Sequence, residues 1–239
     1  DINFFGFSEV IDKGKIVVLN MNIANYKNLS KLIATYLKLD FQTDVISRLN
    51  NPNFNKKSNF IDIFNSTSNR PVCFISDEYQ EYVTLSDSAF FAQSREAKCI
   101  NIVSTQSYTS LLNTLNNEAS VKVIIQNLVN KLWFRNDDIF TIEEAQKQIG
   151  KEEKKKISKT ISENAKETNY NYFFNNFLSR NSNISESINS YFQTDYIYDI
   201  NFFTRNLETF SCLAFLSDGT NILTPQKLKL IPYFKGGKT

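Results

Sequence analysis

The chain has 239 residues, 41% of them hydrophobic, which is enough for one large domain or two small ones with a sizeable buried core. Its 27 basic and 25 acidic side chains leave a net charge of +2, which excludes a strong overall field for attracting nucleic acid. The chain contains no histidine, which excludes the commonest general base and metal ligand.

The spacing of the three cysteines and the length of the apolar runs further limit the class of protein that this sequence can form. Cys73, Cys99 and Cys212 fit no zinc-binding spacing, and we expect them to be reduced core residues of a cytosolic protein. No apolar run approaches the roughly 20 residues of a membrane-spanning helix, so we expect a soluble segment. The sequence begins with Asp1 instead of methionine, and we expect it to be part of a longer protein.

The first elements read as a strand and a long helix. GKIVVLNMN, residues 14–22, is an apolar run that predicts a buried strand. In residues 28–50 apolar side chains recur every three or four positions, which predicts an amphipathic helix that ends before Pro52. Residues 50–69 are rich in asparagine and serine and predict a long loop.

The next stretch alternates strands and helices. RPVCFISDEYQEYV, residues 70–83, predicts a buried strand that ends on Asp77 and Glu78, followed by a helix over residues 86–97. AKCINIVSTQS, residues 97–107, predicts a second buried strand that ends on Thr105, Gln106 and Ser107.

The alternation continues to Gly150. Residues 108–115 and 120–129 predict helices, and residues 130–136 predict a strand. Residues 141–150 predict a helix with a capping box from Thr141 to Glu144. Alternating strands and helices indicate an α/β fold built on a parallel sheet.

The character of the sequence changes after Gly150, and we divide the chain into residues 1–150 and 151–239. KEEKKKISKTISENAKE, residues 151–167, predicts a charged helix or a linker, and the asparagine- and aromatic-rich residues 169–192 give no clear assignment. Residues 209–216 and 221–231 flank Asp218-Gly219 and predict a closing β-hairpin.

The two acids at the end of the first strand suit nucleotide hydrolysis. Ligands of open parallel sheets bind at the carboxyl ends of the strands. Asp77 could hold Mg²⁺ through its water shell, and Glu78 could orient a water that attacks a γ-phosphate. The alternative is a strand that leaves the sheet into an acidic, solvated loop.

Two later residues favour the catalytic interpretation. Gln106, at the end of the neighbouring strand, could contact the γ-phosphate, and Arg95 could neutralise developing charge from an adjacent subunit. Alternatively, Gln106 caps the following helix and Arg95 is a solvated cation at a helix end. The order of the set, strand-DE, helix-SRE and strand-TQS, favours function over chance.

These motifs resemble those of a known family. The run PVCFISDEYQEYV, FFAQSREAKCINIVSTQSYTSLL and LVNKLWFRNDDIFTIEEAQKQIG is similar to the C-terminal half of the motor domain of type IV secretion coupling proteins. These are conjugative DNA-transfer ATPases, hexameric RecA-like motors on the cytoplasmic face of the bacterial inner membrane. The resemblance spans residues 14–150 and continues more weakly through the closing hairpin.

The resemblance implies a fold and a set of roles. The fold would be a RecA-like P-loop NTPase sheet with helices on both faces. Asp77 would be the Mg²⁺-side Walker B acid, Glu78 the catalytic carboxylate, and Gln106 the residue that contacts the γ-phosphate of ATP. Arg95 lies at the position of a candidate arginine finger, and Arg135 has a structural role.

One part of the family pattern is absent. No phosphate-binding Walker A loop precedes these residues, and we expect it upstream of Asp1. The 239-residue chain by itself would then hydrolyse ATP negligibly.

The resemblance also implies partners. We expect a homo-hexamer at full length, with a relaxase or secretion-machinery proteins as protein partners. Two segments, residues 51–60 and 169–180, carry the basic and aromatic side chains that non-specific DNA binding needs, but solvated loops and core aromatics explain them as well. The open alternatives are a related DNA translocase, a pilus-assembly ATPase, or an inactive RecA-like binding module.

Overall fold

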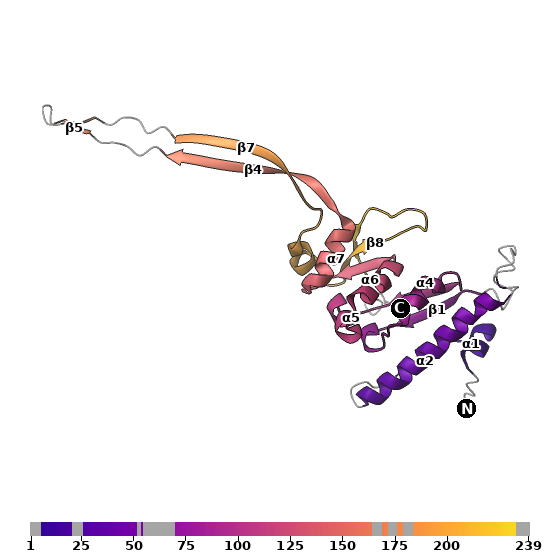
Figure 1. Ribbon diagram of the computed structural model, residues 1–239. Coiled ribbons are helices and arrows are strands. Elements are labelled where there is room, and N and C mark those ends of the chain that lie inside the picture. Colours follow the sequence, from indigo (N-terminus) through magenta and orange to yellow (C-terminus); the bar gives the residue numbers. More distant parts are fainter. Residues whose placement is uncertain are drawn as a thin grey trace, which may run out of the picture. The chain divides into compact units, whose positions relative to one another are not determined.

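A computed structural model describes residues 6–20, 26–51, 54, 70–163, 169–171, 176–178 and 184–232. The chain forms two compact units, one from Asp1–Glu144 with Ile200–Thr239 and one from Ala145–Asp199 (Figure 1). The division of the chain at residue 150 stays a prediction.

The first unit contains most of the helices. Its helical elements are α1 (Phe7–Lys13), α2 (Lys27–Ser47), η1 (Arg48–Asn50), η3 (Tyr79–Glu81), α4 (Asp87–Ser94), α5 (Tyr108–Leu115), α6 (Glu118–Asn127), the start of α7 (Ile139–Ile149), and the π-helical turn η4 (Phe202–Asn206). The predicted helices over residues 28–50, 86–97, 108–115 and 120–129 are confirmed.

The first unit contains a parallel pair of strands. β1 (Val72–Ser76) pairs with β2 (Cys99–Val103) in a register that places Ser76 opposite Val103. One face of the pair packs on the core, where the ring of Phe74 stacks on Phe41 of α2 at 5.7 Å. Both predicted strands are therefore confirmed as a parallel pair, but the prediction that they are buried is wrong, because no residue of β1 and only Cys99 of β2 is buried.

The other face of this pair is exposed. Ile75 is 71% exposed, and Ile100 and Ile102 are each 54% exposed. Cys73 lies on the same face, so the prediction that all three cysteines are core residues is wrong for Cys73, whereas Cys99 and Cys212 are buried. The reason is the two-residue alternation of a strand, which turns Val72 and Phe74 inward and Cys73 outward.

A second, antiparallel sheet completes the first unit. β3 (Lys131–Phe134) pairs with β8 (Ser211–Phe215), and β8 pairs with β9 (Gln226–Lys229). The predicted closing hairpin is thus confirmed, and Asp218 accepts backbone hydrogen bonds from Thr220 and Asn221 in its connecting turn. The third predicted strand joins this antiparallel sheet instead of the parallel pair.

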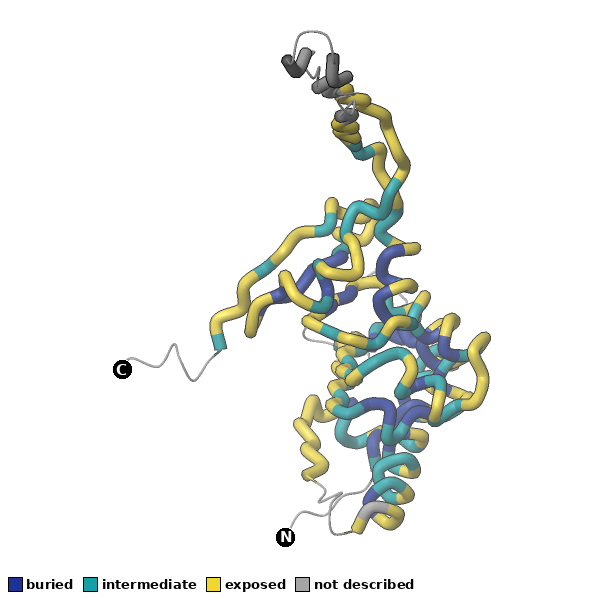
Figure 2. The backbone as a smooth tube through the Cα atoms, turned by 90° about the vertical axis from the view of Figure 1, so that its left-hand side faces the viewer, coloured by how far each residue is buried: buried dark blue, intermediate teal, exposed yellow. Residues whose placement is uncertain are grey.

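The second unit is a ribbon of two long strands. β4 (Lys151–Glu163) pairs antiparallel with β7 (Ile184–Tyr196), and β5 (Asn169–Asn171) pairs with β6 (Asn176–Leu178). Figure 2 shows exposed or intermediate residues along the ribbon and buried residues within the helices of the first unit. The predicted charged helix after Gly150 is wrong, because residues 151–163 form a strand that pairs along its whole length with Ile184–Tyr196.

Two other predictions have different outcomes. Residues 15–20 form no strand, and Ile16 and Val18 are 91% and 80% exposed, so the prediction of a buried strand there is wrong for the described part of that run. A strand needs a hydrogen-bonding neighbour, and within the described residues this run has none. Most of residues 50–69 and of the two candidate DNA-binding segments lie outside the described residues.

The described part of the chain is therefore a mixed α/β fold with small sheets. The expected three-layer sheet does not form within it. None of its helices is both long and apolar enough to span a membrane.

Candidate functional site

Three of the predicted site residues, Asp77, Glu78 and Gln106, meet where β1 and β2 end. Backbone hydrogen bonds join the two strand ends, from the Ser104 amide to the Ser76 carbonyl at 2.9 Å and from the Tyr79 amide to the Ser104 carbonyl at 2.9 Å. These bonds hold the segment with Asp77 and Glu78 beside the segment with Gln106. The parallel register thus brings two motifs together that are 28 residues apart in the sequence.

Asp77 is fixed through one of its two carboxylate oxygens. Its Oδ1 accepts a hydrogen bond from the Glu78 amide at 3.0 Å and another from the Ser104 hydroxyl. Within the described residues Oδ2 accepts no hydrogen bond, and the side chain is exposed. Asp77 therefore keeps one oxygen available to a ligand.

Glu78 is oriented by two amide side chains. Gln106 Nε2 donates to Glu78 Oε2 at 3.0 Å, and Gln80 Nε2 donates to the same oxygen. The backbone of Glu78 has a φ of 49°, in the left-handed region that side chains other than glycine and asparagine seldom adopt. A residue held in such a conformation turns the chain sharply at the end of β1 and aims the carboxylate at Gln106.

Gln106 is positioned by Asn136, which follows β3. Asn136 Nδ2 donates to the Gln106 carbonyl oxygen at 2.8 Å, and Ser107 caps α5 by accepting from the Ser110 amide. Gln106 therefore does not cap α5 with its side chain, which leaves that side chain free to contact Glu78. The alternative role of Gln106 as a helix cap is thus wrong.

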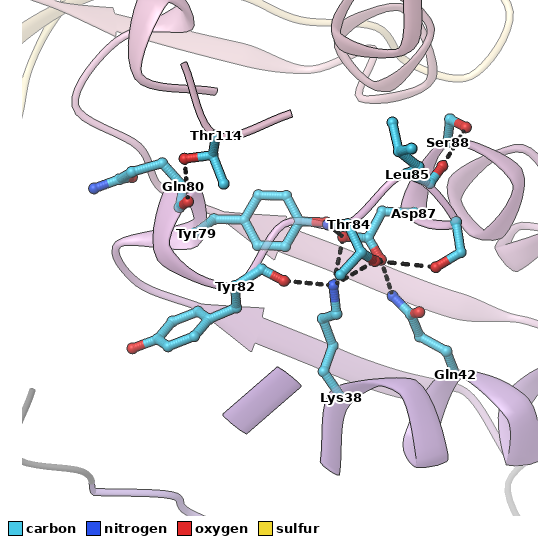
Figure 3. A network of polar contacts seen from close by, with 11 residues as sticks. Lys38, Gln42, Tyr79, Gln80, Tyr82, Thr84, Leu85, Asp87, Ser88 and Thr114 are labelled. Carbon is cyan, nitrogen blue, oxygen red and sulfur yellow. Dashed lines mark hydrogen bonds and ion pairs between the residues drawn. The ribbon is translucent and has the colours of Figure 1, made fainter. Parts of the chain in front are cut away.

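A buried polar network anchors the residue after Glu78 (Figure 3). The Tyr79 hydroxyl donates to Asp87 Oδ2 at 2.5 Å, and Lys38 Nζ lies 2.5 Å from the same oxygen. Gln42 Nε2 donates to Asp87 Oδ1 at 2.9 Å, and the Thr84 amide donates to Oδ2 at 2.8 Å. Three of these side chains are almost fully buried: Lys38 (5% exposed), Tyr79 (0%) and Asp87 (0%).

Burial has opposite effects on the two proton-bearing groups of this network. It raises the pKa of the Tyr79 phenol, and the Asp87 carboxylate raises it further, so the phenol keeps its proton and donates. Burial lowers the pKa of Lys38, and the Asp87 carboxylate offsets part of that effect. The network ties α2 and α4 to Tyr79 and so fixes the backbone on which Glu78 stands.

Arg95 is not brought to this cluster within one chain. It is the C-cap residue of α4, its side chain is exposed, and no hydrogen bond or ion pair joins it to Asp77, Glu78 or Gln106 among the described residues. Arg135 is likewise exposed and follows β3.

Residue patterns alone missed several members of the site. Ser104, Gln80 and Asn136 orient the predicted residues, and Lys38 with Asp87 supports them from the core. Ser104 and Gln80 lie close to the DE and TQS motifs, and this proximity was their only signal in the sequence. Lys38 and Asp87 are separated by 49 positions, and nothing in the sequence indicated that they form a pair.

The chemistry of the site is that of oxygen donors. No group of three or more histidine, cysteine, aspartate or glutamate side chains could hold a metal ion in the part of the chain that the structure describes. The free oxygen of Asp77 suits a hard cation that keeps most of its waters, as Mg²⁺ does. Glu78, held by two amide donors, could orient a water molecule.

Comparison with known proteins places the chain among conjugation proteins. Residues 71–193, just over half of the chain, match the family model described as "TraM recognition site of TraD and TraG". One matching solved structure is described as "Bacterial conjugative coupling protein TrwBdeltaN70. Unbound monoclinic form", with 13% identity and a TM-score of 0.47. The match covers 80% of this chain but 35% of that one, and no curated protein matches.

Proposed function

The chain belongs to the family of the C-terminal region of TraG and TraD coupling proteins, and from this premise we propose that it is part of an ATP-driven motor. In this proposal the full-length protein couples or translocates DNA or protein substrates in bacterial conjugation or type IV secretion.

One observation carries the proposal. Asp77, Glu78 and Gln106 meet at the carboxyl ends of two parallel strands, and Gln106 contacts the Glu78 carboxylate at 3.0 Å. Ligands bind at this end of open parallel sheets. A solvated acidic loop would not need two amide donors on one glutamate oxygen.

Each residue then has a role in ATP hydrolysis. Asp77 would hold Mg²⁺, which when bound would supply charge neutralisation at the phosphates. Glu78 positions the attacking water, and Gln106 contacts the γ-phosphate while it orients Glu78. Residues 1–239 contain no Walker A pattern, so the proposal concerns ATP hydrolysis by the full-length protein.

The RecA-like sheet is also a proposal for the full-length protein. Parallel sheets are normally covered on both faces. The exposed Ile75, Ile100 and Ile102 on the outer face of β1 and β2, and the exposed run over residues 15–20, support a larger sheet that includes further strands and helices.

The exposure of Arg95 supports an action between subunits. We infer that Arg95 acts as an arginine finger on the ATP site of its neighbour in a homo-hexamer, because it is exposed and does not reach Glu78 of its own chain. We place this hexamer on the cytoplasmic face of the inner membrane, with DNA and a relaxase among its partners. The family description adds a TraM-like accessory protein as a further proposed partner.

ATP hydrolysis by the full-length protein tests the proposal. Glu78→Gln should lower the rate at least about 100-fold, because it removes the group that positions and activates water, and Asp77→Asn should lower it similarly. The matched control is Glu81→Gln, which changes a neighbouring carboxylate outside the Asp77, Glu78 and Gln106 cluster. Wild-type rates in purified Glu78→Gln protein would refute the proposal and leave an inactive binding module as the function.

A further inference from the structure

The π-helical turn η4 lies outside the part of the chain that matches the family model. It spans Phe202–Asn206, whereas the match covers residues 71–193. π-helical turns are rare, and they occur frequently at functional sites. The contacts of η4 decide whether it has such a role in this protein.

The turn is anchored within the first unit. Phe203 is 1% exposed, and Leu207, directly after the turn, is fully buried. In addition, Lys227 Nζ of β9 donates a hydrogen bond to the Asn206 carbonyl at 2.9 Å. A turn held by buried side chains and by a neighbouring strand has a defined position, against which other groups can be placed.

Asn136 joins η4 to Gln106. Its backbone amide donates to the Phe203 carbonyl of η4 at 3.3 Å, and its Nδ2 donates to the Gln106 carbonyl at 2.8 Å. Its Oδ1 accepts from the Asp138 amide at 2.7 Å. The side chain can serve these last two partners in one orientation only, with its nitrogen toward the carbonyl and its oxygen toward the amide.

A purely local role explains only one of these three contacts. An asparagine whose side-chain oxygen accepts from the amide two residues later forms an Asx turn, which is common in short connections. That turn requires neither the bond from Nδ2 to Gln106 nor the bond from the backbone amide to Phe203. The two remaining contacts join segments that are far apart in the sequence, and both of them end at Asn136.

The contacts continue from Gln106 to the carboxylate of Glu78. Gln106 Nε2 donates to Glu78 Oε2 at 3.0 Å, and Gln106 is exposed. An exposed glutamine has several rotamers available, so its placement depends on how firmly its backbone is held. A misplacement of about 1 Å in a reacting group can lower a rate by about 100-fold, so such support matters for hydrolysis.

We propose that Asn136 is a positioning residue that holds Gln106 beside Glu78, and that η4 sets the position of Asn136. A displacement of η4 then moves Asn136, and with it the residue that contacts the γ-phosphate. The effect on hydrolysis rests on the proposed ATP site, whereas the connection from η4 through Asn136 to Gln106 does not.

Two asparagines that flank β3 supply a matched pair of variants. Asn136→Asp keeps the side-chain oxygen that accepts from Asp138 but removes the donor to Gln106. Asn130→Asp keeps the side-chain oxygen that accepts from the Ser217 amide at 2.7 Å. Both substitutions add one negative charge, and only the first removes a hydrogen bond to the proposed site.

In the full-length protein, Asn136→Asp should lower kcat for ATP hydrolysis by about tenfold or more, with ATP affinity within about threefold of wild type. Asn130→Asp should change either value by less than about twofold. In a Gln106→Ala background, Asn136→Asp should lower the rate by less than about twofold further, because it acts through Gln106. An equal loss with and without Gln106 would reveal a merely structural role and overturn the proposal.

Deletion of Thr204 tests the contribution of η4, because it shortens the turn and displaces the Phe203 carbonyl. Its control, Thr204→Ala, removes a hydroxyl that donates to the Ile200 carbonyl at 3.2 Å and keeps the length of the turn. The deletion should lower kcat by about tenfold or more, and the control by less than about twofold. If circular dichroism shows that the shortened protein does not fold, Phe203→Leu loosens the same turn instead. An unchanged kcat in the folded variant would contradict the role of η4.

Hydrogen exchange on the same full-length proteins keeps the test independent of ATP turnover. Asn136→Asp should speed the exchange of backbone amides in residues 104–108, and Asn130→Asp should not. Unchanged exchange in Asn136→Asp would overturn the proposed connection. Faster exchange together with wild-type hydrolysis in Glu78→Gln would refute the ATP site and leave the connection standing.

Discussion

At the scale of single residues, the site depends on one buried charge pair. Lys38 and Asp87 come from α2 and α4, and Asp87 also accepts the Tyr79 hydroxyl next to Glu78. A buried ion pair is weak evidence for net stability, but loss of one partner is costly because an uncompensated charge remains in the core. The pair therefore serves to fix a geometry, namely the left-handed turn at Glu78.

Removal of the buried lysine should destabilise the fold. Lys38→Met should lower the free energy of unfolding by about 3–5 kcal/mol, because Asp87 is then left buried without its cation. The control is Lys31→Met on the same helix, where the lysine lies 4.0 Å from Glu81 on the surface; its cost should stay below about 1 kcal/mol. Urea unfolding measures both, and similar losses would contradict the role of the buried pair.

The residues of the site differ in how well the sequence predicts them. Asp77, Glu78 and Gln106 could be found because each follows an apolar strand, and strand ends are where ligands bind. Gln80 and Asn136 could not, because polar side chains near a motif have no periodicity that separates contact from solvation. From the sequence, Lys38 would be assigned to the surface of its helix, and its burial becomes visible only when α4 is packed beside α2.

At the scale of elements, a strand depends on the strand with which it pairs, and the local sequence does not show that neighbour. The helices and the positions of β1 and β2 were predicted correctly from local patterns, but the burial predicted for the two strands was wrong, because their outer face is exposed. The first strand of the ribbon was mistaken for a helix because lysine and glutamate favour helices, and because the four-residue spacing of Ile157 and Ile161 fits one face of a helix as well as one face of a strand. Residues 15–20 have the composition of a strand, but composition does not show whether a second strand is available to form hydrogen bonds with them.

At the start of α7, the residue that caps the helix lies three positions before the predicted one. The predicted cap, Thr141, is instead the third helical residue, and Asp138 caps the helix by accepting from the Thr141 amide at 3.0 Å. Asp138 also accepts from the Thr109 hydroxyl at 2.6 Å and so ties α5 to α7. Arg135, Asp138 and Thr141 stand three positions apart in the sequence, and of these Asp138 makes the contacts that hold the start of the helix.

Replacement of this cap should cost stability in a pH-dependent way. Asp138→Ala should lose about 1–2 kcal/mol at neutral pH, whereas Asp137→Ala, at an exposed neighbour, should lose less than about 0.5 kcal/mol. Burial raises the pKa of Asp138, but hydrogen bonds from Thr109 and Thr141 outweigh it, and the net pKa lies below the usual range.

The sign of the pH effect follows from that lowered pKa. The stabilisation is complete above the unfolded pKa of about 4 and is lost as the pH falls through the lower folded value. The difference in unfolding free energy between wild type and Asp138→Ala should therefore shrink below about pH 4. A constant difference from neutral to acidic pH would show that the carboxylate charge contributes nothing.

At the scale of the whole molecule, the proposed function depends on more than the described residues. The ATP site that we propose needs a phosphate-binding loop from elsewhere in the protein and Arg95 from a neighbouring subunit. The exposed outer face of β1 and β2 agrees with a sheet completed by other parts of the protein.

Mixed assemblies test whether Arg95 acts between subunits. Full-length Arg95→Ala and Glu78→Gln proteins should each hydrolyse ATP slowly, by about 100-fold or more below wild type. Assemblies formed from both together should recover part of the activity, because some interfaces then combine an intact Glu78 with an intact Arg95. Activity of the mixture that only equals the average of the two parents would contradict action across the interface.

The most direct test of the central claim measures ATP binding and single-turnover hydrolysis side by side on full-length Glu78→Gln. If Glu78 positions the attacking water, nucleotide affinity should stay within about threefold of wild type, and the hydrolysis rate should fall at least about 100-fold. Hydrolysis at the wild-type rate with unchanged affinity would contradict the claim that Asp77, Glu78 and Gln106 form the hydrolytic side of an ATP site.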